Sequence, residues 1–279
     1  MLSFPNCKIN LGLRILDKRP DGYHNLQTVF YPIPLYDALE IIRNPEKQPE
    51  IVFTTTGIPV TTPDEENLCI KAWKRIKNNY PNIAPVRVHL HKSIPSGAGL
   101  GGGSSDAAFT LVLLNNLFQL GLSEDELMAH ALSLGSDCPF FIHNKPCSGS
   151  GRGEVLSPLD IRLNGMYLVL INPGIHIPTG KAFAGLSTLR AGRTIDLLPL
   201  EQLPGLPVRE WKRLLVNDFE EVVFPEYPEI GAIKDELYNR GALYASLSGS
   251  GSTVFGLFED ETDAGSGWPQ AWFVRTLLL

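Results

Sequence analysis

The sequence is low in charge and lacks any long apolar run. Charged residues make up 19% of the 279 residues and the net charge is −6, so general binding to nucleic acid or to anionic membranes is not expected. The longest purely apolar run, residues 166–171, is far shorter than the about 20 residues that span a bilayer. No basic segment followed by an apolar one marks a secretory signal. We therefore expect a cytoplasmic protein without a membrane segment.

Metal-ligating patterns are also scarce. No Cys-x-x-Cys spacing occurs among the four cysteines, which is typical of free thiols in a reducing compartment. Among the six histidines, His89 and His91 share a face of an expected strand, but no carboxylate or cysteine stands near them in the sequence. Because a protein-made metal site needs three or four converging ligands, this pair predicts no metal cage.

Glycine and proline are abundant instead, with 26 and 22 residues. The 43% of hydrophobic residues is enough to build a core and argues against intrinsic disorder. Strand patterns dominate the first half, and a helix interrupts them, so the layout is α+β rather than a regular alternation of strands and helices. We expect two lobes, residues 1–155 and residues 156–279, that meet near a glycine-rich loop at 149–154.

The hydrophobic periodicity places the elements along the chain. A strict alternation from Cys7 to Ile15 predicts a half-buried strand with Lys8 and Asn10 on its polar side. A capping box at Ser123–Glu126 opens a helix. Further strands are predicted at 26–31, 38–42, 51–55, 86–90, 140–142, 166–171, 243–247, 253–258 and 271–279. Further helices are predicted at 68–79, 106–120, 209–223 and 229–240.

One segment concentrates five glycines within seven residues, between an expected strand and an expected helix. Glycine permits positive φ and close approach to a ligand, and a helix N-terminus offers unpaired N–H groups, so this pattern favours a phosphate cradle. A tight connection with capping serines would need only one or two glycines. The segment consists of Pro95, Ser96, Gly97, Ala98, Gly99, Leu100, Gly101, Gly102, Gly103, Ser104 and Ser105.

Two familiar phosphate motifs do not fit this segment. It satisfies Gly-x-Gly-x-x-Gly literally, but the position about 20 residues on that should end a second strand in an acid is Glu124, inside the capping box. The Walker pattern requires lysine where Gly103 stands. The cradle therefore needs a cation from elsewhere, and Lys8 or Mg²⁺ are the candidates.

The Pro-x-x-x-Gly-Leu-Gly-Gly-Gly-Ser-Ser pattern resembles the ATP loop of the galactokinase, homoserine kinase, mevalonate kinase and phosphomevalonate kinase superfamily. Three more segments narrow the resemblance to a member whose acceptor carries a cytidine diphosphate group: residues 8–11 with Asp21-Gly-Tyr-His24, residues 135–141 and residues 247–252. The resemblance extends from residue 5 to about residue 258. It implies a two-lobed fold, with an N-terminal lobe like domain 2 of ribosomal protein S5 and a ferredoxin-like C-terminal lobe.

The resemblance also implies catalytic roles for Lys8 and Asp137. The matching lysine of the family pairs with the catalytic aspartate and steadies the acceptor hydroxyl, and Asn10 would bind substrate beside it. From the residues alone, Lys8 is most simply an ordinary exposed strand lysine. Asp137 fits a residue that caps a turn as well as it fits a base. Asp137 is expected to precede an apolar strand, where partial burial would raise its pKa.

Binding residues are implied in the same way. Tyr23 would stack on the cytosine ring, His24 would hydrogen-bond its edge, and Phe183 with the nearby Thr179 would complete the substrate site. Without the resemblance, Tyr23 and His24 read as a packed aromatic and an exposed histidine. The second glycine loop, with Gly249 and Ser250, would lie near the ATP phosphates, or else be an ordinary hairpin turn.

The expected partners are therefore ATP, Mg²⁺ and a small cytidine diphosphate sugar-alcohol, with no nucleic acid and no membrane. The helix after the glycine segment offers no acid beyond Asp106, so the magnesium ligands are unknown, as is the oligomeric state. Alternatives are a kinase of the same superfamily that acts on homoserine or mevalonate, and a nucleotide-binding protein without catalysis. The missing acid-bearing strand disfavours a dinucleotide-dependent oxidoreductase.

Overall fold

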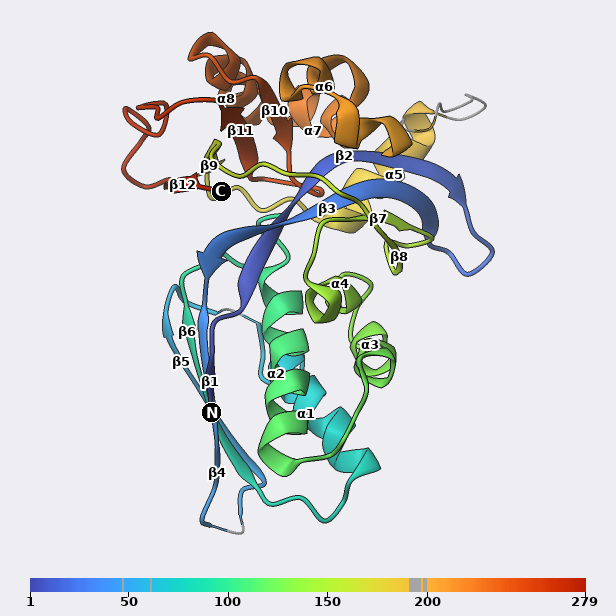
Figure 1. Cartoon of the computed structure of the whole chain (residues 1–279), viewed down its shortest axis with the longest axis vertical. Coiled ribbons are helices and arrows are strands. Elements are labelled where there is room, and N and C mark those ends of the chain that lie inside the picture. Colours follow the sequence, from blue (N-terminus) through green and yellow to red (C-terminus); the bar gives the residue numbers. More distant parts are fainter. Residues whose placement is uncertain (47, 61, 191–196, 198–199) are drawn as a thin grey trace. The chain divides into compact units, whose positions relative to one another are not determined.

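The computed structural model describes residues 1–46, 48–60, 62–190, 197 and 200–279 (Figure 1). The chain forms two compact units, each made from segments far apart in the sequence. Unit 1 contains Met1–Cys7, Leu35–Ser96 and Gly101–Lys145, and unit 2 contains Lys8–Pro34, Gly97–Leu100 and Pro146–Leu279. The lobe boundary predicted after residue 155 falls inside unit 2, and the glycine-rich segment contributes to both units.

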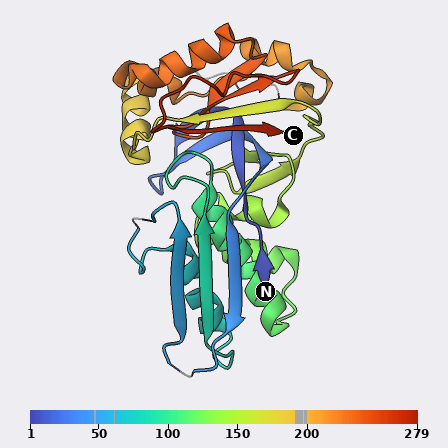
Figure 2. The same ribbon diagram turned by 90° about the vertical axis from the view of Figure 1, so that its left-hand side faces the viewer.

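Unit 1 is built on a four-stranded sheet in the order β1-β4-β6-β5, with β5 parallel to β6 and the other pairs antiparallel. Helices α1 and α2 cover one face of this sheet (Figure 1), and Figure 2 presents the opposite face. The elements are β1 (Leu2–Ser3), β4 (Ala38–Arg43), β5 (Ile51–Gly57), β6 (Val86–Lys92), α1 (Leu68–Asn79), α2 (Gly102–Phe118), α3 (Glu124–Leu132) and α4 (Cys138–His143).

Local signals in the sequence account for most of unit 1. The alternation in β6 buries Val86, Val88 and Leu90 against the helices. The predicted capping box is present at the start of α3, where Ser123 Oγ accepts from the Glu126 amide and the Glu126 carboxylate accepts from the Ser123 amide. The predicted bounds of α1 are confirmed.

Unit 2 contains two four-stranded sheets, in the orders β2-β3-β7-β8 and β10-β11-β9-β12. The second sheet carries α8 on one face, and its core includes Val169, Ile233 and Leu247. The elements are β2 (Asn6–Lys18), β3 (His24–Tyr36), β7 (Cys147–Ser150), β8 (Val155–Pro158), β9 (Tyr167–Asn172), α5 (Thr179–Leu189), η1 (Leu200–Gly205), α6 (Val208–Leu214), α7 (Glu220–Glu226), α8 (Pro228–Asn239), β10 (Tyr244–Leu247), β11 (Val254–Phe258) and β12 (Phe273–Leu278).

The second sheet has the antiparallel strand order of a ferredoxin-like domain, as the resemblance predicts for the C-terminal lobe. The crossover between β11 and β12, all of it described, contains no helix. Two stacked tryptophans, Trp268 and Trp272, with ring centroids 5.8 Å apart, pack against the core there instead. The Arg240 guanidinium lies over Trp268, 4.9 Å from the ring centroid. Residues beyond 258, where the resemblance ends, thus pack against the core of unit 2.

Three predicted elements were wrong in type or extent. Residues 140–142 belong to helix α4, because a short apolar run fits a buried helix as well as a strand. The single helix predicted over 209–223 is two helices, α6 and α7, separated by residues 215–219. Helix α2 begins at Gly102 rather than at Asp106, so the last glycines and the two serines are its first turn.

The sequence predicts no membrane segment and cysteines that remain thiols. In the part of the chain that the structure describes, no helix is long and apolar enough to cross a membrane. All four cysteines lie within that part and are buried free thiols. Burial raises the pKa of the thiols of Cys138 and Cys147 to about 12, which leaves them poorly reactive at neutral pH.

Candidate active site

Lys8 is buried, so the reading of an exposed strand lysine is wrong. Its side chain lies within β2, which is buried on both faces over its first eight residues rather than half-buried. Lys8 Nζ donates to Asn10 Oδ1 at 2.6 Å and to the Gly99 carbonyl at 3.1 Å, and it lies 5.5 Å from the centre of the Phe30 ring. The Lys8 amide donates to Leu100 O. A buried ammonium with this set of acceptors is a positioned charge rather than a solvated one.

The Asn10 side chain is also fixed by hydrogen bonds from both ends of its amide group. Its Nδ2 donates to Thr28 Oγ1 at 2.9 Å, and that hydroxyl donates to the Gly12 carbonyl at 2.6 Å. These contacts fix which way the Asn10 amide points, so Oδ1 faces the Lys8 ammonium. Thr28, which the sequence analysis did not single out, therefore belongs to the same group.

The first half of the glycine segment, Gly97–Leu100, lies in unit 2 against the second glycine loop. Gly97 and Gly99 both have positive φ, 65° and 79°. A β-carbon at Gly99 would stand 2.0 Å from Ser248 O, so no other residue fits without movement. Ser248 Oγ donates to the Gly99 carbonyl at 2.9 Å, so that one oxygen receives both this hydroxyl and the Lys8 ammonium.

The second half, Gly101–Ser105, lies in unit 1 and starts α2. Gly101 is the N-cap in a left-handed conformation, with φ of 71°. Ser104 and Ser105 lie inside the first turn rather than at the N-cap, so they are not the capping serines of the alternative tight connection. Ser105 Oγ is buried and has no hydrogen-bond partner among the described residues. The first turn thus presents backbone N–H groups and the partial positive charge of the helix end, as a phosphate cradle requires.

A buried ionic group lies directly behind this turn. Lys92 Nζ donates to Asp106 Oδ2 at 2.7 Å and forms a very short contact with Asp37, which also accepts from the amides of Ser93 and Ile94. A β-carbon at Gly102 would lie 3.4 Å from Lys92 Nζ. Burial, reinforced by Asp37 and opposed by Lys92, raises the pKa of Asp106 to about 7.

Asp137 is half-buried at the N-cap of α4, and it precedes a helix rather than the predicted strand. Its side chain makes no capping hydrogen bond to that helix in the described structure. Cys138, Pro139 and Phe140, which follow it, are buried and anchor its backbone. The backbone that carries Asp137 is therefore anchored in unit 1 by the buried residues that follow it.

The implied cytosine residues gather in unit 2. His24 and Phe183 stack at 5.1 Å between ring centroids with an angle of 15°, and His24 Nε2 lies 3.0 Å from Ser187 Oγ. Burial, together with Lys18, lowers the pKa of His24, which keeps its ring neutral at physiological pH. Tyr23 is 57% exposed, and the Arg152 guanidinium lies over its ring at 4.8 Å.

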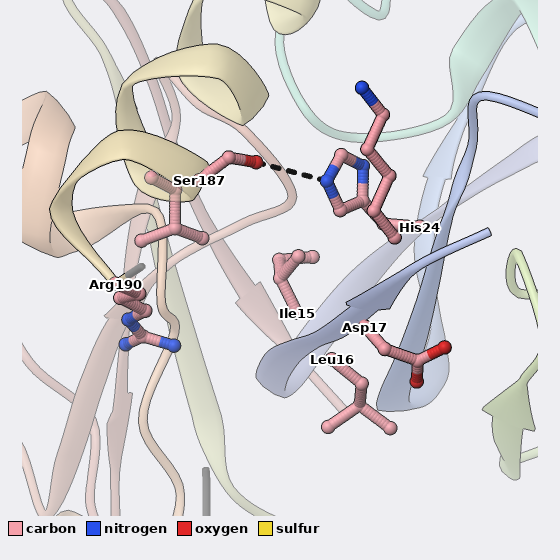
Figure 3. Close-up of a pocket in the computed structure, with 8 residues that line it drawn as sticks. Ile15, Leu16, Asp17, His24, Ser187 and Arg190 are labelled. Carbon is pink, nitrogen blue, oxygen red and sulfur yellow. Dashed lines mark hydrogen bonds between the residues drawn. The ribbon is translucent and has the colours of Figure 1, made fainter. Parts of the chain in front are cut away.

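A cavity of about 500 Å³ opens beside this pair (Figure 3). It lies within unit 2, between the C-terminal end of β2 and the C-terminal end of α5. Polar and charged groups, Asp17, Lys18 and Arg190 among them, share its wall with leucine and isoleucine side chains. The lining residues are Ile15, Leu16, Asp17, Lys18, His24, Leu186, Ser187 and Arg190.

Thr179 and Ser250 contact each other, with 2.9 Å between their hydroxyl oxygens. This pair joins the start of α5 to the second glycine loop, where Gly249 and Gly251 have positive φ. The loop connects β10 and β11, as predicted. In unit 2 the structure thus brings together Lys8, Asn10, the first half of the glycine segment and the second loop.

Comparisons with known proteins show which family the chain belongs to. The family model described as "GHMP kinases N terminal domain" matches residues 67–145, and "GHMP kinases C terminal" matches residues 203–268. The 4-diphosphocytidyl-2-C-methyl-D-erythritol kinases of Bacteroides thetaiotaomicron and Parabacteroides distasonis are 50% and 52% identical to the chain. Each comparison covers 94% of this chain and 93% of the relative. The chain belongs to the GHMP kinase family.

Solved structures of the family share the fold. A crystal structure of 4-(cytidine 5'-diphospho)-2C-methyl-D-erythritol kinase superimposes with a TM-score of 0.78 and 31% identity, covering 99% of this chain and 98% of that one. The homoserine kinase of Cytophaga hutchinsonii matches with a TM-score of 0.63 at 16% identity, over 98% of this chain and 94% of that one, which indicates the common fold alone. The predicted two-lobed α+β GHMP kinase fold is confirmed.

Several residues of this GHMP kinase escaped the sequence analysis. Asn217, Asn172 and Lys92 are buried polar residues that support the two glycine-rich segments. Asn217 sits in a stretch that reads as one continuous helix, and Lys92 ends an alternating strand. A polar side chain on the apolar side of a strand is the only hint, and Lys92 provides one.

Metal ligands remain unassigned. Among the described residues, no group of three or more His, Cys, Asp or Glu side chains could hold a metal ion. His89 instead lies between Thr54 and Thr56, at 2.9 and 3.0 Å from their hydroxyls, and His91 lies 2.9 Å from Thr56. A kinase commonly holds Mg²⁺ through one or two carboxylates and the nucleotide phosphates, so a full protein cage is not needed.

Proposed function

We propose that this chain transfers the γ-phosphoryl group of ATP to the 2-hydroxyl of 4-diphosphocytidyl-2-C-methyl-D-erythritol, a step of the non-mevalonate route to isoprenoid precursors. The observation that carries the proposal is the identity of about half of all positions with curated kinases of this name, over nearly the whole length of both chains. The chain also retains Lys8, Asp137 and the glycine-rich segment, the residues that the family's chemistry uses.

The described residues fit ATP. The first turn of α2 offers the N–H groups of Gly102–Ser104, which precede the first intrahelical hydrogen bond, and the glycines before it have the positive φ that lets a backbone curl around phosphate. Pro95, Ser96 and the second loop, with Gly249 and Ser250, complete the residues that we assign to ATP. Mg²⁺ would accompany the nucleotide phosphates and neutralise part of their charge. The protein itself needs to supply position and charge, not covalent chemistry.

Within the reaction, the Lys8 ammonium stabilises the negative charge on the transferred phosphoryl group and holds the acceptor hydroxyl. Asn10 and the Gly99 carbonyl orient that ammonium. Asp137 accepts or orients the hydroxyl proton, as the catalytic aspartate of kinases does. His24, Phe183, Tyr23 and Thr179 bind the cytidine end of the acceptor, with stacking worth about 1–3 kcal/mol per base.

The test is ADP release from Mg·ATP by the purified chain with three separate acceptors: the cytidine diphosphate compound, homoserine and mevalonate. We expect release only with the cytidine compound, because only that acceptor has a base to stack between aromatic rings. Release with homoserine or mevalonate alone would assign a different GHMP kinase activity. No release with any acceptor would leave a nucleotide-binding protein without catalysis.

Lys8→Ala and Asp137→Asn test the assigned roles. Each should lower kcat by about 10²-fold or more, as expected for loss of general acid–base or charge-stabilising groups, while the circular dichroism spectrum stays unchanged. Matched controls are Lys74→Ala on α1 and Asp125→Asn on α3, whose side chains are exposed. Near-normal turnover in Lys8→Ala or Asp137→Asn would remove that residue from the chemistry.

His24→Ala tests the cytidine site. Because His24 stacks on Phe183 and lines the cavity, its loss should raise KM for the cytidine acceptor several-fold and leave KM for ATP within about twofold. Equal increases in both KM values would contradict a role in base recognition.

A further inference from the structure

Asn217 lies in the break between α6 and α7 and is 2% exposed. It forms a parallel bridge with Leu13 of β2, and the amide of Leu13 donates to Val216 O at 2.8 Å. This pairing explains why the apolar pattern of 209–223 does not continue as one helix: residues 216–218 bond to β2 instead. The break carries a buried polar side chain next to the strand that holds Lys8.

Every polar atom of the Asn217 side chain is engaged. Its Nδ2 donates to Leu247 O and to Gly249 O, both at 2.8 Å, and its Oδ1 accepts from the Phe219 amide at 3.0 Å. The two carbonyls flank Ser248 along the chain, so one amide group spans the start of the second glycine loop. Asparagine supplies the two donors on one nitrogen that this arrangement uses, whereas aspartate supplies none.

Ser248, the residue between those carbonyls, contacts the glycine segment at Gly99. Ser248 Oγ donates to the Gly99 carbonyl at 2.9 Å, and Ser248 O would stand 2.0 Å from a β-carbon at Gly99. The same Gly99 carbonyl accepts from the Lys8 ammonium at 3.1 Å. Continuous contacts therefore join Asn217, the second loop, Gly99 and Lys8, all within unit 2.

We propose that Asn217 is a positioning residue for phosphoryl transfer. It fixes the carbonyls of Leu247 and Gly249, so that Ser248 holds the Gly99 carbonyl where it orients the Lys8 ammonium. The proposal rests on the proposed function, since it assigns Asn217 a part in the reaction that Lys8 serves. Displacement of about 1 Å in a positioning group can reduce a rate by about 10²-fold, so a buried amide remote from the reacting atoms can matter for turnover.

A second buried asparagine beside the same loop provides a matched control. Asn172, 5% exposed, donates to Thr253 Oγ1 at 2.9 Å and to Ser252 Oγ at 3.2 Å, and it makes neither of the carbonyl contacts that Asn217 makes. Removing either amide leaves buried groups unpaired, so both alanine variants lose stability. Only Asn217→Ala removes the hydrogen bonds that hold the carbonyls on either side of Ser248. A purely structural role predicts similar behaviour in the two variants.

The kinetic experiment compares Asn217→Ala, Asn217→Asp, Ser248→Ala, the double variant Asn217→Ala with Ser248→Ala, and Asn172→Ala. All are measured well below their unfolding midpoints. We expect kcat to fall about tenfold or more in both Asn217 variants, with KM for the cytidine acceptor within about twofold. Ser248→Ala should reduce kcat, and the double variant should lose little beyond the larger single effect, because both act through one contact. Asn172→Ala, which leaves the hydrogen bonds to the Leu247 and Gly249 carbonyls in place, should reduce kcat several-fold less than Asn217→Ala.

Amide hydrogen exchange supplies a readout that needs no acceptor. The Lys8 amide donates to Leu100 O, and the Thr253 amide donates to Ala98 O, so both amides report on the glycine segment. Exchange at Lys8 should accelerate at least several-fold in Asn217→Ala and stay near the wild-type rate in Asn172→Ala.

The outcomes separate the two proposals. Wild-type exchange and kcat in folded Asn217→Ala, or kcat losses that multiply in the double variant, would overturn the positioning role. If the wild-type chain phosphorylates no cytidine acceptor but Asn217→Ala still accelerates exchange at Lys8, the proposed function fails while the mechanical link from Asn217 to the glycine segment is supported. Unchanged exchange in that case would overturn the link as well.

Discussion

The two glycine-rich segments of this GHMP kinase rest on different kinds of support. In unit 1, the first turn of α2 is backed by a buried ammonium, Lys92, between two buried carboxylates, Asp37 and Asp106. In unit 2, the loop at 248–253 is held by two neutral amides, Asn217 and Asn172. Charged groups that leave water cost several kcal/mol each and depend on their partners, whereas amides cost less and do not titrate.

This difference predicts distinct sensitivities. Removing one partner of the ionic group should greatly lower the free energy of unfolding, and the contribution of this group should depend on pH. The amide support should respond to geometry and be indifferent to pH. Each variant below breaks one of the two kinds of support.

Lys92→Met should have the largest effect on stability. The change leaves two buried carboxylates without their cation, and breaking a buried ion pair by removing one partner costs about 3–5 kcal/mol. Urea unfolding measures the loss. The control is Lys74→Met on α1, where the side chain is exposed and the free energy of unfolding should change by less than about 0.5 kcal/mol. Equal, small losses of unfolding free energy in both variants would show that Lys92 does not stabilise the buried side chains of Asp37 and Asp106.

Gly99→Ala should come next. A β-carbon there meets Ser248 O at 2.0 Å, and φ is 79°, so left-handed strain of about 1–2 kcal/mol adds to the clash. Gly103→Ala is the matched control, because a β-carbon at Gly103 has no atom within 4 Å in the described structure and its backbone is helical. We expect that control to be neutral or slightly stabilising. A Gly99→Ala protein as stable as Gly103→Ala would contradict the packing of the two glycine-rich segments in unit 2.

Asp106→Asn should have a smaller effect, visible in the pH dependence. The folded chain holds the Asp106 proton with a pKa of about 7, whereas the unfolded value is about 3.9, so the free energy of unfolding falls as pH rises from about 4 to about 7. Asparagine keeps the acceptor for Lys92 but removes this slope. Asp37, Lys92 and the Cys69 thiol also face Asp106; the carboxylates keep the pKa of Lys92 raised despite burial, and burial raises that of Cys69.

Urea unfolding at about pH 5, 6, 7 and 8 tests this expectation. The wild-type chain should lose more stability across that range than Asp106→Asn, and the difference should favour the variant at high pH. Parallel curves for the two proteins would mean that Asp106 is ionised throughout. Asn217→Ala, which removes a neutral group, should keep the wild-type slope while lying lower at every pH.

The sequence revealed the elements whose signals are local. The Ser123 capping box and the spacing in 68–79 were sufficient for α3 and α1, because their cause lies within one turn of the chain. Residues 140–142 were mistaken for a strand because three apolar residues carry no period. The helix predicted over 209–223 was broken by pairing with β2, about 200 residues away. Only tertiary contacts show such a break.

The site divides in the same way. Five glycines within seven residues predict a phosphate cradle from the sequence alone, because the residues that would form it are neighbours in the chain. The burial of Lys8 and the support from Asn217 and Lys92 were not visible, since their partners lie far along the sequence: Gly99 for Lys8, Gly249 for Asn217 and Asp37 for Lys92. A polar residue on an alternating strand looks exposed until the second face is known to be covered.

The most direct test of the account is the position of the transferred phosphoryl group. The purified chain is incubated with Mg·ATP and 4-diphosphocytidyl-2-C-methyl-D-erythritol, and the products are followed by phosphorus NMR and mass spectrometry. The account predicts equal amounts of ADP and of acceptor carrying one additional phosphoryl group on its 2-hydroxyl. An unchanged acceptor, or phosphate on a different hydroxyl, would contradict it.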